Sequence, residues 1–187
     1  MFKRIHYNSP VILTFTFISF AVLLLDKSTG GFTNNLLFTN FRTSIKDPLQ
    51  YVRLFSYILG HANWSHFSGN FLIILLVGPM VEEKYGSSSL MEMILVTAFL
   101  TGLINTIFFN AGLLGASGIV FMLILLSSFA NVESGKVPLT LIIVTFVFLG
   151  KEILSGLLIK DNISQFAHIF GGLCGGIFGY LRHRGEL

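Results

Sequence analysis

The sequence predicts an all-α, polytopic membrane protein, folded as a bundle of six transmembrane helices. Hydrophobic residues make up 53% of its 187 residues and charged residues only 11%, and the mean hydropathy is +0.78. Such a chain has too little polar surface to cover a water-soluble globule, so its main solvent must be lipid. The length accommodates one compact membrane domain, 1–187, with no substantial soluble domain beside it.

Six apolar segments divide the chain. The first follows Lys3 and Arg4 and ends at Asp26 and Lys27, and no small-residue cleavage site comes after it, so we interpret it as an anchor and not as a signal peptide. The mixed stretch 27–53 is predicted to be a loop on the membrane surface. We predict spans at about residues 11–25, 65–81, 90–109, 117–130, 138–155 and 164–181.

The charges and the cysteine count narrow the function classes. The net charge is +3, but the Lys and Arg residues lie at segment ends, which is typical of membrane orientation and not of a nucleic-acid-binding stripe. Six spans put both termini on one side, and the basic residues near both ends predict that this side is cytoplasmic. The single cysteine, Cys174, allows neither an intrachain disulfide nor a thiolate zinc cluster. We expect no metal, no organic cofactor and no nucleic-acid partner.

Polar side chains inside the apolar segments mark candidate functional sites, because they cost several kcal/mol in hydrocarbon unless they meet a partner or water. His66 and Asn70 are four residues apart near the start of the second segment and therefore share one helix face. They either point at one target or form a polar pair that locks two helices together. His61 is predicted to lie at the mouth of this span or at the membrane interface.

Ser117 lies in the sequence Gly115-Ala116-Ser117-Gly118, directly before the fourth segment. The glycines permit a tight turn, and a helix that begins at the serine offers free backbone N–H groups to an oxyanion. A helix over 117–130 rises only about 21 Å, against a hydrocarbon core of about 30 Å, so Ser117 should lie below the membrane surface in a polar pocket. A serine between glycines is also a common helix-packing residue.

His168 precedes a ladder of glycines in the sixth segment, at Gly171, Gly175 and Gly179. Small residues at this spacing let a neighbouring helix approach closely. If the neighbour is the fourth segment, the His168 imidazole comes within reach of the Ser117 hydroxyl and can act as its general base. Alternatively, the histidine binds an interhelical hydroxyl, a metal or a proton.

Together these features resemble the rhomboid family of intramembrane serine proteases. The likeness extends from about Arg53 to Leu181 and is carried by three sequences: His61-Ala-Asn-Trp-Ser-His66-Phe-Ser-Gly-Asn70, Gly115-Ala-Ser-Gly118, and Ala167-His168 before the glycines. It implies a rhomboid-like bundle with Ser117 as nucleophile and His168 as general base. It also implies an oxyanion hole formed by His66, Asn70 and the backbone N–H of Ser117.

The likeness further implies supporting positions around this dyad, at His61, Gly115, Gly118 and Phe121. Arg53 would brace the first loop, which would lie half in the membrane, and a loop over about 155–163 would cap the site. Glu82 and Gly86 would lie at the inner end of the second span, where we interpret Glu82 as a solvated helix end. Two positions depart from many members: Val52 replaces a tryptophan before the arginine, and Phe121 replaces a tyrosine that stacks on the histidine.

The function implied by the likeness is hydrolysis of peptide bonds in transmembrane or membrane-proximal segments of substrate proteins. The expected partners are therefore transmembrane substrates and the lipid bilayer. Two alternatives stay open: a non-catalytic rhomboid-like protein that binds client helices, and a small transporter or proton channel, for which the sequence shows no convincing repeat. From size alone, we expect a minimal enzyme of a prokaryotic plasma membrane.

Overall fold

The computed structural model describes residues 6–109, 111–129, 136, 139–158 and 162–184. The helices in these residues are α1 (Pro10–Ser28), α2 (Pro48–Ser56), α3 (Trp64–Tyr85), α4 (Ser87–Phe108), α5 (Ser117–Ser128), α6 (Leu139–Leu158) and α7 (Asn162–Arg184), with short helices η2 (Asn34–Phe38) and η3 (Tyr57–Leu59). The only β-type pairing among the described residues is one antiparallel bridge between Asn40 and Leu113. The predicted all-α class is confirmed.

Each predicted span coincides with a helix, but among the described residues fewer of these helices are long and apolar enough to be counted as spans. α1, α3 and α4 are long and apolar enough to cross a membrane, whereas α5 is apolar and shorter. A count of six spans therefore stays a prediction. The predicted capping loop over 155–163 is wrong in its first part, because α6 continues to Leu158; residues 159–161 lie outside the described part of the chain.

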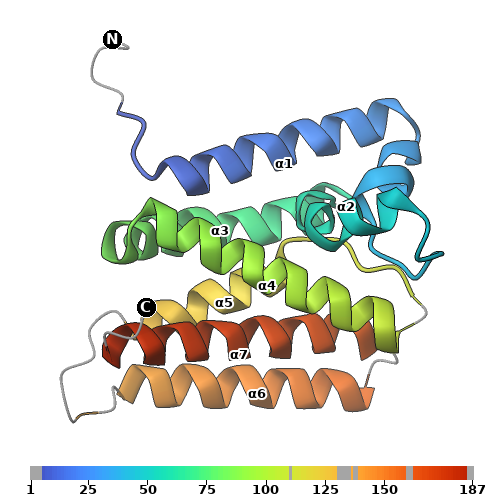
Figure 1. Ribbon diagram of the computed structural model, residues 1–187. Coiled ribbons are helices and arrows are strands. Elements are labelled where there is room, and N and C mark those ends of the chain that lie inside the picture. Colours follow the sequence, from blue (N-terminus) through green and yellow to red (C-terminus); the bar gives the residue numbers. More distant parts are fainter. Residues whose placement is uncertain (1–5, 110, 130–135, 137–138, 159–161, 185–187) are drawn as a thin grey trace.

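The helices are stacked in layers (Figure 1). α1 packs on α3, which together with α4 forms the middle of the bundle, and α5 packs chiefly on α7, with α6 beyond them. The start of α1 and the end of α7 lie on the same side of the molecule in Figure 1, which is the arrangement that an even number of spans requires. Most of α5 is wholly enclosed, with Ile119, Met122, Leu123 and Leu126 almost inaccessible.

Glycines bring α5 and α7 into backbone contact. A Cβ atom built on Gly171 would lie 2.8 Å from the Cα of Gly118, and one built on Gly175 would lie 2.9 Å from the Cα of Met122. Non-bonded carbon atoms are most favourable at about 3.5–4.0 Å, so a side chain at either position would force the helices apart. The close approach that the glycine spacing predicts is confirmed at these positions.

The first loop contains a helix that the sequence reading missed. α2 begins at Pro48 after Asp47, whose carboxylate accepts the backbone N–H of Leu49 at 3.0 Å, an N-terminal capping arrangement. α2 lies against α4, where a Cβ on Gly102 would come within 2.7 Å of the Leu54 carbonyl oxygen. The predicted membrane-surface loop over 27–53 is therefore wrong over residues 48–53, because capping and packing on α4 stabilise a short helix there.

Arg53 braces this loop from within. It is only 5% exposed, and its guanidinium donates to the Leu36 carbonyl at 2.9 Å and to the Asp47 carboxylate at 3.1 Å. The guanidinium carbon also lies 4.6 Å from the centre of the Phe41 ring, a cation–π distance. Val52, the neighbouring departure from the family pattern, is 47% exposed. The brace forms without a tryptophan at that position.

Glu82 is buried, and its interpretation as a solvated helix end is wrong. Its carboxylate accepts the backbone N–H groups of Val11 and Ile12, both at 3.0 Å, and the Ser87 hydroxyl at 2.7 Å. These N–H groups belong to the first turn of α1, which no side chain of its own caps. The negative charge therefore stabilises the N-terminus of α1 and fastens that helix to the junction of α3 and α4.

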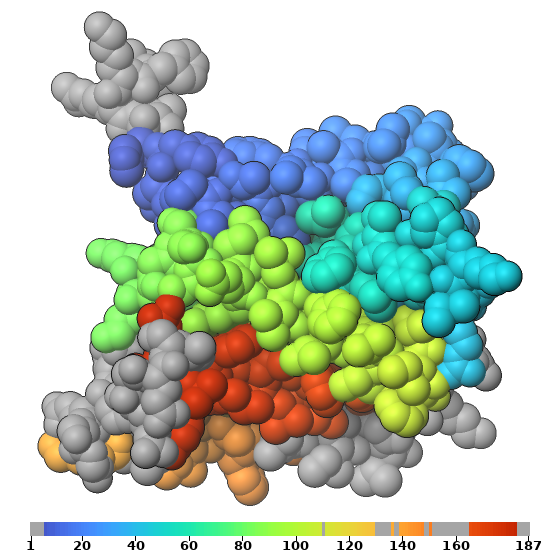
Figure 2. Space-filling model, in the orientation of Figure 1, coloured from blue at the N-terminus to red at the C-terminus, as the bar shows by residue number. Residues whose placement is uncertain are grey.

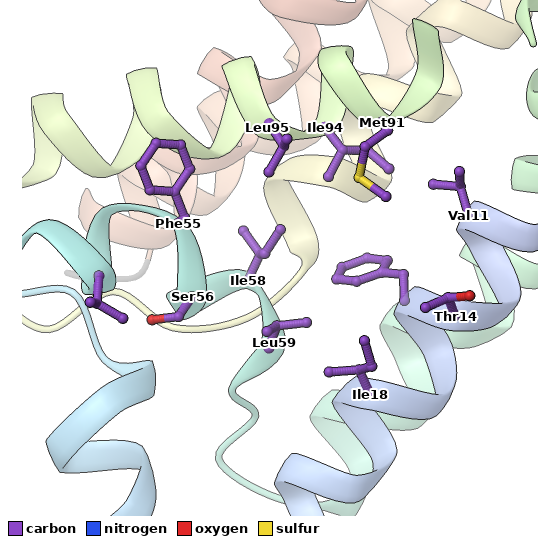
Figure 3. Close-up of a pocket in the computed structure, with 12 residues that line it drawn as sticks. Val11, Thr14, Ile18, Phe55, Ser56, Ile58, Leu59, Met91, Ile94 and Leu95 are labelled. Carbon is purple, nitrogen blue, oxygen red and sulfur yellow. The ribbon is translucent and has the colours of Figure 1, made fainter. Parts of the chain in front are cut away.

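An apolar groove of about 450 Å³ lies between α1, the α2–η3 segment and α4 (Figure 3). Both hydroxyl groups at its edge are already hydrogen bonded, that of Thr14 to the Tyr7 hydroxyl and that of Ser56 to the Leu37 carbonyl. Such a surface suits contact with lipid. None of the predicted site residues lines the groove, so it has no part in the chemistry described next.

Candidate active site

Ser117 is the first residue of α5, and Gly115 makes the turn before it. Gly115 has φ +121°, a conformation that residues with side chains rarely adopt. The first backbone bond of the helix runs from the Val120 N–H to the Ala116 carbonyl, so the preceding N–H groups have no partner within the helix. In Figure 1 α5 begins partway along α7 and not at its end, so the N-terminus of α5 lies within the length of the bundle.

Hydrogen bonds of its backbone to the first loop and to the residues before α3 hold this turn, and one of them has a side chain as partner. They join Leu113 and Asn40 in both directions at 2.8 Å, the Gly115 N–H to the Tyr57 carbonyl at 2.9 Å, and the Ala116 N–H to Nε2 of His61 at a longer 3.4 Å. Buried backbone groups need such partners, because water does not reach them. The position of Ser117 is therefore set by residues far earlier in the chain.

α3 brings His66 and Asn70 to the same turn. A Cβ atom on Gly115 would lie 2.7 Å from Nε2 of His66 and 3.8 Å from Nδ2 of Asn70. The Asn63 side chain caps α3 by accepting the His66 N–H at 2.9 Å, which fixes where the helix begins and hence which face carries both residues. The two side chains thus line the turn that immediately precedes Ser117.

His61 is fully buried, although the sequence placed it at the mouth of the span or at the interface. Its Nε2 lies 3.1 Å from Nδ2 of Asn70 and also faces the Ala116 N–H, while its Nδ1 lies 3.2 Å from the Leu59 carbonyl. Nε2 therefore accepts hydrogen bonds and Nδ1 carries the proton. Burial and the nearby charge of His66 lower the pKa of His61 to about 4, so the ring is neutral at pH 7.

α7 places His168 beside the start of α5. The rings of His168 and Phe121 lie with their centres 4.5 Å apart at 43°. A Cβ atom on Gly118 would lie 3.2 Å from the Ala167 carbonyl oxygen, so the residue after Ser117 touches the residue before His168. Ser117 and His168 are both half-buried.

The predicted site residues thus come from three helices and two loops to one region. They are His61, His66, Asn70, Gly115, Ser117, Gly118, Phe121 and His168. A hydroxyl at a helix N-terminus beside an imidazole, with further N–H donors around the same turn, is the chemical equipment for acyl transfer.

Two contacts of this region were not foreseen. Asn40 and Tyr57 hold the turn through their backbones, but both lie outside the six predicted apolar segments. The neighbouring Phe38 and Phe41 are a signal in the sequence for the burial of Asn40.

A protein-family model described as the Rhomboid domain matches residues 48–185. The chain belongs to the rhomboid family. All the site residues of this rhomboid protein lie inside the matched range, and α1 lies before it. The motifs around Ser117 and His168 therefore lie in the part of the chain by which the family is recognised.

Three curated relatives give this rhomboid protein a wider context. It is similar to Rhomboid-like protein 11, chloroplastic, of Arabidopsis thaliana, with 30% identity over 123 residues, covering 64% of this chain and 40% of the relative. It is also similar to Rhomboid protease GluP of Bacillus subtilis, with 29% identity over 182 residues, covering 91% of this chain and 34% of the relative. RHOMBOID-like protein 1 of Arabidopsis thaliana is 28% identical over 139 residues, covering 69% and 34%. The chain spans between a third and two fifths of the length of these relatives.

Proposed function

We propose that this rhomboid protein is an intramembrane serine endopeptidase that cleaves transmembrane or membrane-proximal segments of other proteins. The observation that supports the proposal is that α5, which begins at Ser117, packs on α7 through Gly118 against Ala167 and Phe121 against His168, with His66 and Asn70 of α3 beside Gly115. The similarity to a bacterial protein named as a rhomboid protease supports the same reaction type. The proposed location is a prokaryotic plasma membrane with both termini cytoplasmic.

In the proposed reaction, the His168 imidazole takes the proton of the Ser117 hydroxyl as its Oγ attacks the substrate carbonyl carbon. The carbonyl oxygen becomes an oxyanion and accepts hydrogen bonds from His66, Asn70 and the Ser117 N–H. His168 then gives its proton to the leaving amine, and an acyl-enzyme remains on Ser117. A water molecule, deprotonated by His168, hydrolyses this ester and restores the serine.

The hydrogen bonds of Asn70 support its role in this scheme. An amide NH₂ group has two donor hydrogens, and His61 accepts one of them through Nε2. That contact orients the amide, so that its nitrogen, which lies near Gly115, keeps the second hydrogen for the oxyanion. Phe121 provides the corresponding support for His168, because its ring packs against the imidazole without needing a hydroxyl.

A serine-directed fluorophosphonate probe on the purified, detergent-solubilised protein tests the proposal. We expect the wild type to be labelled and the Ser117→Ala and His168→Ala variants not to be. Ser127→Ala is a matched control, because Ser127 lies on the same helix and its hydroxyl only donates to the Ile124 carbonyl of that helix. If the folded wild type is not labelled, the protein is a non-catalytic binder of client helices.

A further inference from the structure

We infer that Asn40 and Asn105 form a buried clamp that positions the Ser117 turn, and that both are positioning residues for catalysis. The inference rests on the proposed function, because it concerns the rate at which Ser117 reacts. Neither residue lies in the sequence motifs that point to the site. Both side chains are fully buried, at 0% exposure.

The clamp joins the first loop to the end of α4. The Asn105 side-chain nitrogen lies 3.0 Å from Oδ1 of Asn40, 3.2 Å from its carbonyl oxygen and 3.3 Å from the carbonyl oxygen of Ala111. The Thr106 hydroxyl donates to the same Oδ1 at 3.1 Å. Figure 2 shows the cyan residues of the first loop lying directly against the yellow-green end of α4, where these contacts occur.

The clamp acts on the reactive turn through the backbone. Asn40 exchanges two hydrogen bonds with Leu113, each at 2.8 Å, and Asn105 reaches the carbonyl of Ala111. Both contacted residues precede Ser117 by no more than six positions. The segment contains Gly115, which has a positive φ. Glycine restricts the backbone less than other residues do, so this segment keeps one conformation only if its two ends are held.

This arrangement predicts that loss of the clamp slows the reaction of Ser117 in addition to lowering the stability of the fold. A misplacement of about 1 Å at reacting groups can lower a rate by about 100-fold, whereas the binding of a small probe depends less on it. Removing the Asn105 amide leaves the Ala111 carbonyl without this donor. It also takes one donor from Oδ1 and one from the carbonyl oxygen of Asn40, which then keep only the Thr106 hydroxyl and the Leu113 N–H. The segment before Ser117 then loses its hydrogen bond to α4, while the side chains of Ser117 and His168 are themselves unchanged.

The test measures fluorophosphonate inactivation at increasing probe concentration, which separates the limiting rate of labelling from the apparent affinity. The variants are Asn105→Ala, Asn40→Ala and the double variant, each with its Tm. We expect the limiting rate to fall at least about 10-fold with the affinity unchanged within about 2-fold. The double variant should be no slower than the slower single variant, because both break one connection.

Two further variants separate positioning from stability alone. Asn40→Asp keeps the Oδ1 acceptor, and the Asn40 nitrogen that it replaces has no partner, so this variant should recover at least half of the wild-type rate. Glu82→Gln weakens a buried contact away from the turn, so it should lower Tm and leave the rate unchanged. If Asn105→Ala does not fold, the comparison of Asn40→Ala with Asn40→Asp decides the question.

The inference is overturned if the asparagine variants lose Tm as Glu82→Gln does and label within 2-fold of the wild-type rate. It is also overturned if Asn40→Asp is as slow as Asn40→Ala. Ser117→Ala, measured alongside, keeps the two proposals apart. If it is labelled like the wild type, the proposed function fails; if it is not labelled while the asparagine variants are normal, only the clamp fails.

Discussion

Adding one methyl group to α7 should disable the proposed dyad, because α5 and α7 touch through their backbones next to it. In Gly171→Ala, the new Cβ would lie 2.7 Å from the carbonyl carbon and 2.8 Å from the Cα of Gly118. Favourable carbon–carbon contact needs about 3.5–4.0 Å, so the helices must separate by about 1 Å at this point. Gly118 follows Ser117 directly, and Gly171 lies one turn after His168.

The separation has two calculable consequences. Overpacking of this kind costs about 1–3 kcal/mol of unfolding free energy. A movement of about 1 Å between a nucleophile and its base lowers the reaction rate by about 100-fold. We therefore expect Gly171→Ala to remain folded at low temperature while its limiting rate of fluorophosphonate labelling falls by roughly two orders of magnitude.

Gly176→Ala on the same helix is the matched control, since a Cβ atom there would meet nothing within 4 Å. Its rate of labelling should equal that of the wild type, and its Tm should be equal or higher because alanine favours a helix over glycine. The reasoning is refuted if Gly171→Ala labels as fast as Gly176→Ala in samples that are both folded by circular dichroism.

Three other perturbations follow from buried contacts. Glu82→Ala should lower the unfolding free energy by about 2–4 kcal/mol, because it leaves two buried N–H groups without an acceptor. Glu83→Ala should not, because Glu83 is exposed, and thermal unfolding of both variants tests the difference. Phe121→Ala should slow labelling by about 2–10-fold through loss of ring packing on His168, and equal rates for Phe121→Tyr and Phe121→Ala would contradict this. Folding lowers the pKa of His61 from 6.5 to about 4, so as the pH falls the unfolded chain binds a proton at this ring before the folded chain does. The contribution of His61 to the unfolding free energy is therefore complete above about pH 6.5 and falls by about 3 kcal/mol towards pH 4. His61→Gln should flatten this part of the curve of Tm against pH, and parallel curves for wild type and variant would refute the argument.

The helices and the centre of the site could be predicted because each has a local signal. An apolar run of sufficient length needs no tertiary information to become a helix in lipid. A four-residue spacing places His66 and Asn70 on one face, and the same spacing of Gly171 and Gly175 predicts close approach of a neighbour. These features depend only on residues that are near in sequence.

What could not be predicted depends on contacts between distant residues. Glu82 lies among charged residues at a helix end and looks solvated, but it is buried because α1, some 70 residues earlier, presents two N–H groups to it. His61 similarly looks interfacial until Asn70 and Ala116 supply the donors that it accepts. α2 was missed because its nine residues form a stable helix only with their cap and with α4 beside them.

The first loop helps to position the proposed active site for a reason that follows from the shortness of α5. A short buried helix obliges the irregular backbone before Ser117 to enter the bundle, and at that depth each polar backbone group needs a protein partner. Besides Asn105 of α4, those partners are the backbone of Asn40, the Tyr57 carbonyl and the His61 imidazole, which lie in the first loop or just before α3. Folding of the first loop, with Arg53 buried at its centre, is therefore a condition for the position of Ser117 that the proposed reaction requires.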